Sequence, residues 1–119
     1  MGYRSQIASI IYDKKEFMDK FKAENAELLR LLDDEFNDGS LKYLDNGDYD
    51  FIYLNGNDWK WYPTYKEVKA WHDLMDLAEK KELAVEFVRI GDDYDDVEVD
   101  CRNDYQYYLN VERFIEATF

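Results

Sequence analysis

The sequence predicts an α+β fold: a mainly antiparallel sheet with two helices on one face, in the order β-α-β-β-β-α-β-β-β. Two Asn-Gly dipeptides stand between alternating apolar residues, which is typical of two-residue hairpin turns. Two longer segments repeat apolar residues every three or four positions, which predicts amphipathic helices. With its extra strands set aside, this order resembles a split βαβ, ferredoxin-like arrangement. The 119 residues contain no proline- or glycine-rich linker, so residues 1–119 are expected to form one domain.

The first strand is expected at residues 3–12. Its apolar side chains divide between two faces, with Ile7 and Ile11 on one and Ala8, Ile10 and Tyr12 on the other. A strand that is apolar on both faces suits the centre of a sheet covered on both sides.

A long helix is expected at residues 14–36, with Asp13 as its N-cap and Glu16 completing a capping box. Gly39 follows as a left-handed stop. The predicted buried stripe consists of Phe17, Phe21, Leu28, Leu32 and Phe36.

Three short strands are expected next, at residues 41–44, 49–54 and 59–62, joined by turns at Asn46-Gly47 and Asn55-Gly56. Pro63 ends the third strand because proline has no N–H for a ladder.

The second helix is expected at residues 65–81, capped by Thr64 with Glu67 three positions later. Its apolar stripe consists of Val68, Trp71, Leu74, Met75 and Ala78. Trp59 and Trp61 share one strand face. They either pack under this helix, which we favour, or form an exposed recognition platform.

Three further strands are expected at residues 83–90, 97–101 and 107–115. Val97, Val99 and Cys101 alternate with acidic residues, so Cys101 is expected to be a small buried core residue.

The charge balance is strongly acidic, with 28 acidic residues against 15 basic ones and a formal net charge of -13. This balance disfavours direct binding to nucleic acid or to an anionic membrane, and it favours a basic partner protein. One cysteine cannot form an internal disulfide, and the sequence shows neither a signal peptide nor a long apolar run. We therefore expect a cytoplasmic protein.

The densest carboxylates follow residue 91. Asp96, Glu98 and Asp100 alternate along a strand, which puts them on one face about 7 Å apart. Such a face either serves solubility or imitates the phosphate array of a duplex and occupies a basic nucleic-acid-binding cleft. Tyrosines nearby would add rigid contact area with a polar tip. The candidate partner-binding residues are Asp92, Asp93, Asp95, Asp96, Glu98, Asp100, Tyr107 and Tyr108.

Enzymatic readings have less support. Residues 92–96 offer oxygen ligands for Ca²⁺ or Mg²⁺, but the twelve-residue EF-hand pattern is absent. His72 precedes Asp76 by four residues without a nucleophile placed beside them. No glycine-rich phosphate loop, zinc spacing or nucleophile elbow is present. We therefore predict no catalytic residue, metal ligand or cofactor. Two alternatives stay open: a small metal-dependent enzyme or ligand-binding protein using residues 92–96, and a self-assembling structural protein using strand edges at Tyr107 and Tyr108.

Four segments carry a resemblance that spans most of the chain: residues 1–5 (MGYRS), 60–69 (KWYPTYKEVK), 87–96 (FVRIGDDYDD) and 111–113 (VER). Together they resemble a group of small acidic phage-encoded accessory proteins that open with MGYRS. That group has no established activity, so the resemblance transfers no site residue. It implies a protein that acts in the cytoplasm of an infected bacterium. Its expected role is to bind and inhibit a host protein, such as a defence factor, in the manner of an anti-CRISPR protein or a nucleic-acid mimic.

Overall fold

The computed structural model describes residues 4–91, 96–103, 108–111 and 115–117 of the chain. Its elements are β1 (Ser5–Lys14), α1 (Lys15–Glu24), α2 (Ala26–Glu35), β2 (Leu41–Asp45), β3 (Tyr49–Trp59), α3 (Lys66–Lys80), β4 (Ala84–Ile90), β5 (Val97–Arg102), β6 (Leu109–Val111) and β7 (Ile115–Ala117). The predicted α+β class is confirmed. The element order differs from the prediction, because the first helix is divided and the strands after it are arranged differently.

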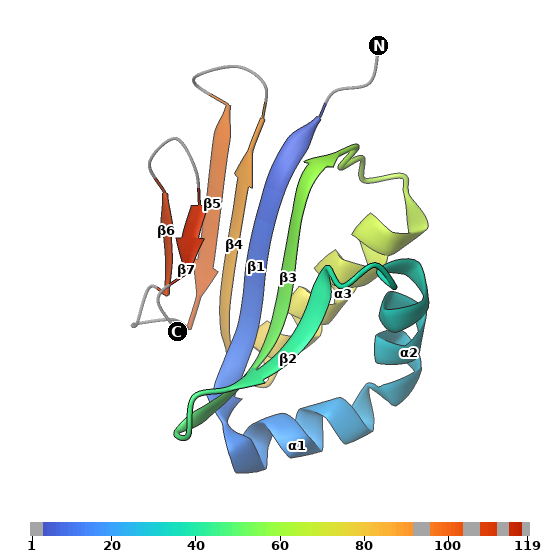
Figure 1. The fold of residues 1–119 in the computed structure, drawn as a ribbon. Coiled ribbons are helices and arrows are strands. Elements are labelled where there is room, and N and C mark those ends of the chain that lie inside the picture. The colour runs from blue at the N-terminus through green and yellow to red at the C-terminus, as the bar shows by residue number, and fades with distance from the viewer. Residues whose placement is uncertain (1–3, 92–95, 104–107, 112–114, 118–119) are drawn as a thin grey trace.

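The main sheet has five antiparallel strands in the order β2-β3-β1-β4-β5 (Figure 1). β1 lies at its centre, as predicted from its two apolar faces, and pairs with β3 on one side and β4 on the other. β6 and β7 form a separate two-stranded sheet. β5 and β2 are therefore the edges of the main sheet.

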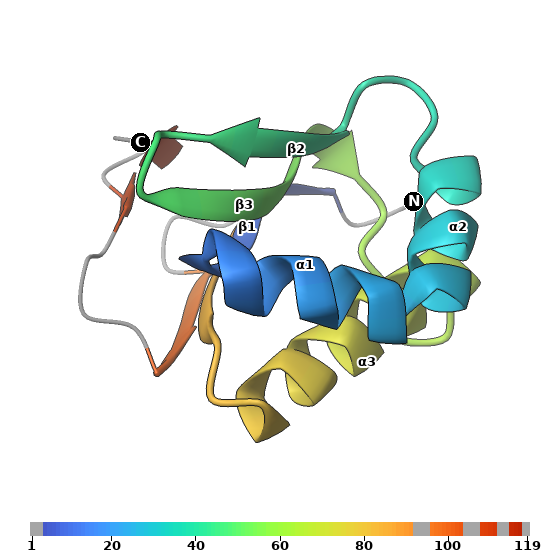
Figure 2. The ribbon, with the colours of Figure 1, turned by 90° about the horizontal axis from the view of Figure 1, so that it is seen from below.

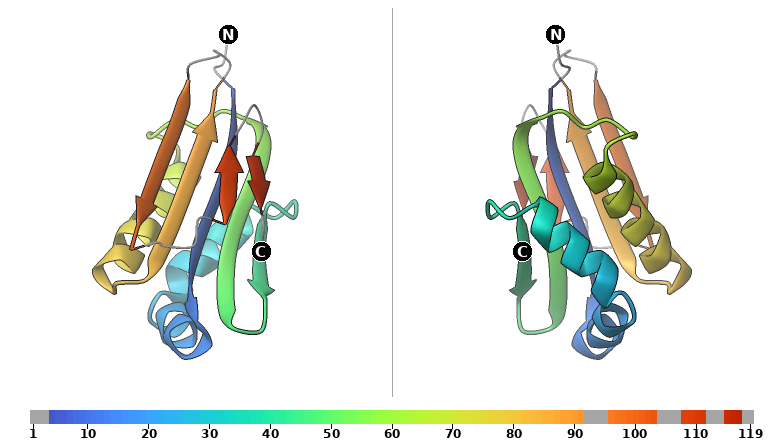
Figure 3. Two further views of the ribbon diagram at one scale, coloured as in Figure 1. Left: turned by 90° about the vertical axis from the view of Figure 1, so that its left-hand side faces the viewer. Right: turned by 90° about the vertical axis from the view of Figure 1, so that its right-hand side faces the viewer.

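The two faces of the sheet carry two cores. The three helices cover one face (Figure 2), where Ile7 and Ile11 pack in a core that contains the fully buried Trp71. Ala8, Ile10 and Tyr12 point to the other face, where they pack with Leu109 of β6. Side views show β6 and β7 against this second face (Figure 3). No helix in the described part of the chain is long and apolar enough to cross a membrane.

The prediction of one helix over residues 14–36 is wrong. α1 ends at Glu24, and Asn25 adopts φ −120° and ψ 29° before α2 begins. The Asn25 side chain donates to the carbonyl of Phe21 at 2.9 Å, which is how asparagine competes with helical backbone bonding. Phe17 on α1 is half exposed, at 50%, although it was expected in the buried stripe.

The predicted N-cap at Asp13 is also wrong. Asp13 belongs to β1, and α1 begins at Lys15 without a side-chain cap. The Asp13 carboxylate instead accepts the backbone N–H of Lys14 at 2.7 Å.

The first Asn-Gly turn is confirmed and the second is wrong. β2 and β3 form a hairpin around Asn46-Gly47, where Gly47 has φ +97°. At Asn55-Gly56, by contrast, β3 continues to Trp59 and Gly56 pairs with Ile7 of β1. The pairing shifts register between Ser5 and Ile7, which marks a bulge or irregularity rather than a turn.

The segment between β3 and α3 differs from the prediction in two respects. Residues 60–62 are not strand, and α3 begins at Lys66 without the predicted Thr64 cap. The expected stripe of α3 is nevertheless buried throughout.

The last strand, predicted over residues 107–115, is instead the β6–β7 pair, whose connecting residues 112–114 lie outside the described residues.

Candidate functional site

Five carboxylates form a surface where α3 meets β5. The β4–β5 register pairs Glu98 with Arg89 and Asp100 with Phe87, and Phe87 is a residue of the helix-side core. The alternation of the strand therefore directs Glu98, Asp100 and Arg102 toward α3. We call this surface the acidic array, defined as Asp76, Glu79, Asp96, Glu98 and Asp100.

Arg89 holds one end of the acidic array. Its guanidinium binds Asp96 in a bidentate manner, with Nη2 2.7 Å from Oδ1 and Nη1 3.1 Å from Oδ2. Its Nε donates to Glu98 at 3.1 Å, and its Nη1 also donates to Ser5 Oγ at 3.2 Å. The Arg89 side chain is only 18% exposed, so these charge-assisted bonds lie in a partly desolvated place where they are strong.

Arg102 holds the other end. Its Nη1 lies 2.8 Å from Asp76 and 3.2 Å from Glu79 on α3, and its Nη2 lies 2.9 Å from Asp100 on its own strand. The Asp100 hydrogen bonds are the largest of the effects that raise the pKa of Arg102 above its ordinary value. The acidic array combines five carboxylates with two guanidinium groups, so its net charge is negative. The two arginines orient the carboxylates.

His72 borders the acidic array as a neutral ring. Burial lowers its pKa, and the charge of Arg102 acts in the same direction. Glu98, Asp76 and Asp100 oppose this shift but do not overcome it. Its ring contacts Phe87 at 5.4 Å and Trp61 at 6.1 Å between centroids. The sequence places Asp76 four residues after His72, but the Asp76 carboxylate binds Arg102.

The other predicted residues are not part of the acidic array as the structure describes it. Asp92, Asp93, Asp95 and Tyr107 fall outside the described residues. Tyr108 packs on the second face of the sheet, edge-on to Tyr12 at 5.0 Å and to Phe51 at 5.1 Å. Within the described ranges, no group of three or more His, Cys, Asp or Glu residues could hold a metal ion.

The face of β5 that points away from α3 is apolar and exposed. Val97 is 41% exposed and Val99 is 58% exposed. Cys101 is exposed as well, so the prediction of a buried cysteine is wrong. The reason is that β5 is an edge strand, whereas the second core is built on β1, β3 and β4.

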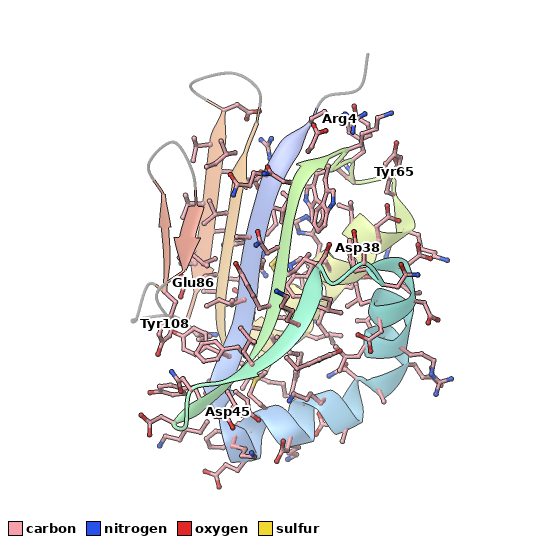
Figure 4. All side chains as sticks on the ribbon, viewed as in Figure 1. Arg4, Asp38, Asp45, Tyr65, Glu86 and Tyr108 are labelled. Atoms are coloured by element: carbon pink, nitrogen blue, oxygen red, sulfur yellow. The ribbon has the colours of Figure 1, made fainter. Side chains whose placement is uncertain are left out.

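A second surface is a cleft of about 260 Å³ between the end of α2, the end of β3 and the start of α3. We call it the aromatic cleft. It is lined by Phe36, Trp59, Trp61, Tyr65, Val68, Lys60, Glu35, Asp38 and Glu67. Figure 4 labels Asp38 and Tyr65 on the two sides of this region.

The aromatic rings of the cleft are stacked in a row. Trp59 stacks on Phe36 at 5.3 Å and on Trp61 at 5.8 Å between centroids. A Cβ at Gly56 would overlap the Trp59 ring, so glycine is needed there for the ring to lie against β3. Both tryptophans also pack partly against the helix-side core, as favoured from the sequence. Sequence reasoning missed the cleft because Phe36 and Asp38 reach it only through the fold; the crowding of tryptophans at residues 59–71 was the available signal.

No family model, curated protein or solved structure matches this chain. The chemistry of the two surfaces therefore follows from their own side chains. The acidic array offers oriented carboxylates, which suit a cationic protein surface. The aromatic cleft offers ring faces next to carboxylates, which suit a single cationic group.

Proposed function

We propose that this protein binds and inhibits a basic, nucleic-acid-binding host protein through its acidic surface, without catalysing a reaction. The observation that carries the proposal is the acidic array, in which Arg89 and Arg102 hold five carboxylates in fixed positions. Side chains that are already ordered lose less conformational entropy on binding than free ones. A solubilising surface has no need of this order.

The overall charge supports the same function. A net charge of -13 steers a basic partner toward the protein and raises the rate of encounter. A partner that normally binds nucleic acid carries a cleft suited to arrayed negative charge. Occupation of that cleft by the acidic array would exclude the nucleic acid and so inhibit the partner.

The resemblance to small phage-encoded accessory proteins implies the setting. The partner would then be a protein of the infected bacterium, with a host defence factor as the preferred candidate. The action would take place in the bacterial cytoplasm, without a membrane and without direct contact between this protein and nucleic acid.

The test compares two variants of equal charge. The array variant neutralises the three more exposed carboxylates and keeps Asp96 and Asp100 as partners of the arginines. It carries Asp76→Asn, Glu79→Gln and Glu98→Gln. The control variant neutralises three exposed carboxylates on α1 and α2. It carries Glu16→Gln, Asp19→Asn and Glu27→Gln.

Each tagged protein is used to capture partners from bacterial lysate at low and high salt, with identification by mass spectrometry. We expect the wild type and the control variant to retain one basic nucleic-acid-binding protein at low salt, and the array variant to lose it. Added duplex DNA should displace the captured protein. Equal capture by the array variant and the wild type would contradict the proposal.

Self-association is a second candidate function, favoured by the edge position of β5 and its exposed Val97 and Val99. An unpaired strand edge with apolar side chains can pair with another copy. Light scattering coupled to size exclusion separates the two candidates, because the inhibitor needs no self-association.

We also propose that β1–β4 and the three helices form a variant of the ferredoxin-like arrangement expected from the sequence. The order β2-β3-β1-β4 with helices on one face supports this, with β5, β6 and β7 as additions.

A further inference from the structure

We infer that the aromatic cleft binds one arginine side chain of the basic partner and so anchors that partner. The inference rests on the proposed function, because it names the group of the partner that is recognised. Its grounds are the size of the cleft, its ring surfaces and the charges at its rim.

The size of the aromatic cleft suits one side chain. Its volume of about 260 Å³ is slightly smaller than that of small-molecule pockets, which start at about 300 Å³. Its walls are the rings of Trp59, Trp61 and Tyr65, and Tyr65 is 37% exposed. Trp59 lies between Phe36 and Trp61 in the stack, so the exposed ring of the wall is that of Tyr65. A phenol ring attracts a cation through its negative π face.

The rim of the cleft carries three carboxylates. Glu67 comes from the first turn of α3. Oδ1 of Asp38 accepts from Ser40 N at 3.1 Å and from Ser40 Oγ at 2.5 Å, and these bonds lower the pKa of Asp38. Asp38 is therefore ionised at neutral pH. Among the residues that the structure describes, neither Glu67 nor Asp38 makes an ion pair, so both are available to a ligand.

The third carboxylate already holds a cation of this chain. Lys66 Nζ lies 2.9 Å from Glu35 Oε1, and Glu35 is the main cause of the raised pKa of Lys66, with smaller contributions from Glu67 and Asp34. The rim thus stabilises positive charge. Lys60 also lines the cleft, so the negative charges of Asp38 and Glu67 are needed to outweigh its positive charge.

The geometry favours arginine over lysine. A guanidinium is planar, stacks on an aromatic face and donates to two acceptors at once, as a place between the Tyr65 ring and two carboxylates requires. An ammonium is a compact, strongly hydrated charge that loses more hydration in such a site. An uncharged side chain would leave Asp38 and Glu67 without compensation.

The test is a titration with the peptide acetyl-Gly-Arg-Gly-amide, followed by the indole N–H resonances in NMR spectra. We expect the Trp59 and Trp61 resonances to shift and saturate, while the fully buried Trp71 stays constant. The citrulline peptide, uncharged but similar in shape, should give no saturable shift. The lysine peptide should bind more weakly than the arginine peptide.

Three variants sharpen the test. Glu67→Gln should weaken binding by roughly threefold, the range of a partly exposed ion pair. Lys66→Gln should strengthen binding, because it releases Glu35. The control is Asp48→Asn, an equal charge change in the turn before β3, whereas Trp59 ends that strand. Asp48→Asn should leave the affinity unchanged.

The outcome separates this inference from the proposed function. Equal binding of the citrulline and arginine peptides, or an equal loss in Asp48→Asn and Glu67→Gln, overturns the cleft as an arginine site. If partner capture still depends on the acidic array in that case, the proposed function stands alone. If the arginine peptide binds but capture does not depend on the acidic array, the proposed function fails and the cleft remains a cationic side-chain site.

Discussion

Glu86 on β4 accepts the backbone N–H of Leu109 on β6 at 2.9 Å, and its other oxygen accepts the N–H of Tyr108 at the same distance. Glu86 is 1% exposed, so this carboxylate is buried between the main sheet and the β6 strand. Figure 4 labels Glu86 and Tyr108 on this side of the molecule. A buried carboxylate is costly unless such bonds satisfy it, which explains why β6 lies where it does.

Replacement of Glu86 by glutamine should loosen β6. The amide keeps one acceptor oxygen and turns an NH₂ group toward the second backbone N–H. We expect a loss of about 1–3 kcal/mol in the free energy of unfolding. Urea denaturation measures it, and hydrogen exchange at Leu109 should become faster. Glu27→Gln, on the exposed side of α2, is the control. Unchanged exchange at Leu109 would contradict the role of Glu86.

Arg102→Gln should destabilise the fold far more than Lys69→Gln. Arg102 is 20% exposed and binds three carboxylates, so its loss leaves several charges uncompensated. The expected loss is about 1–3 kcal/mol. Lys69 pairs with Asp73 on the surface of α3, a contact worth about 0.2–0.5 kcal/mol. Urea denaturation of both variants decides the matter, and equal losses would show that Arg102 does not organise α3 and β5.

Gly56→Ala should displace Trp59 from its stack between Phe36 and Trp61. The new methyl group would occupy space that the indole ring fills. Overpacking of this kind costs about 1–3 kcal/mol. The tryptophan fluorescence spectrum should change together with the unfolding midpoint. Asn57→Ala, at an exposed neighbouring position, should change neither. A normal spectrum in Gly56→Ala would mean that the ring does not lie against β3.

Stability should fall on mild acidification because of His72. Its folded-state pKa lies below the ordinary 6.5, so the unfolded chain binds the proton more readily. The contribution of neutral His72 to the free energy of unfolding is therefore complete above pH 6.5. It is lost as the pH falls toward the folded-state pKa. His72→Phe keeps an aromatic ring beside Trp61 and Phe87 and should flatten this slope.

Asp38 acts in a different pH range. Asp38 has a pKa below 3.8, so its contribution is lost only in stronger acid. Measurements of unfolding free energy between neutral pH and pH 5 thus avoid the range in which Asp38 titrates. An unchanged slope in His72→Phe would assign the effect to another group.

Local pattern was sufficient where one element supplies its own evidence. The apolar spacing of α3 predicted its bounds to within one residue and every buried residue of its face except Ala70. The two apolar faces of β1 predicted its central place. Helical and strand periodicity reflect which side of an element is buried, and that information lies within a short segment.

Local pattern failed where distant partners compete with it. Asn55-Gly56 has the composition of a turn, but pairing with Ala8 and Ile7 of β1 extends β3 through it. The break at Asn25 has a local cause instead, because the apolar spacing continues there while the Asn25 side chain bonds to the carbonyl of Phe21, four residues earlier. Tertiary contacts can override a preference of about 1 kcal/mol, since many long-range hydrogen bonds and buried side chains act together.

The sequence by itself determined the α+β class, the central strand, the main helix stripe and the excess of negative charge. Only the tertiary structure decided which charges meet. Asp76 and Asp100 are 24 residues apart in sequence and share Arg102, and Phe36 and Trp59 stack across the end of β3. The physical reason is that electrostatic and aromatic contacts depend on distance in space, which periodicity along the chain does not encode.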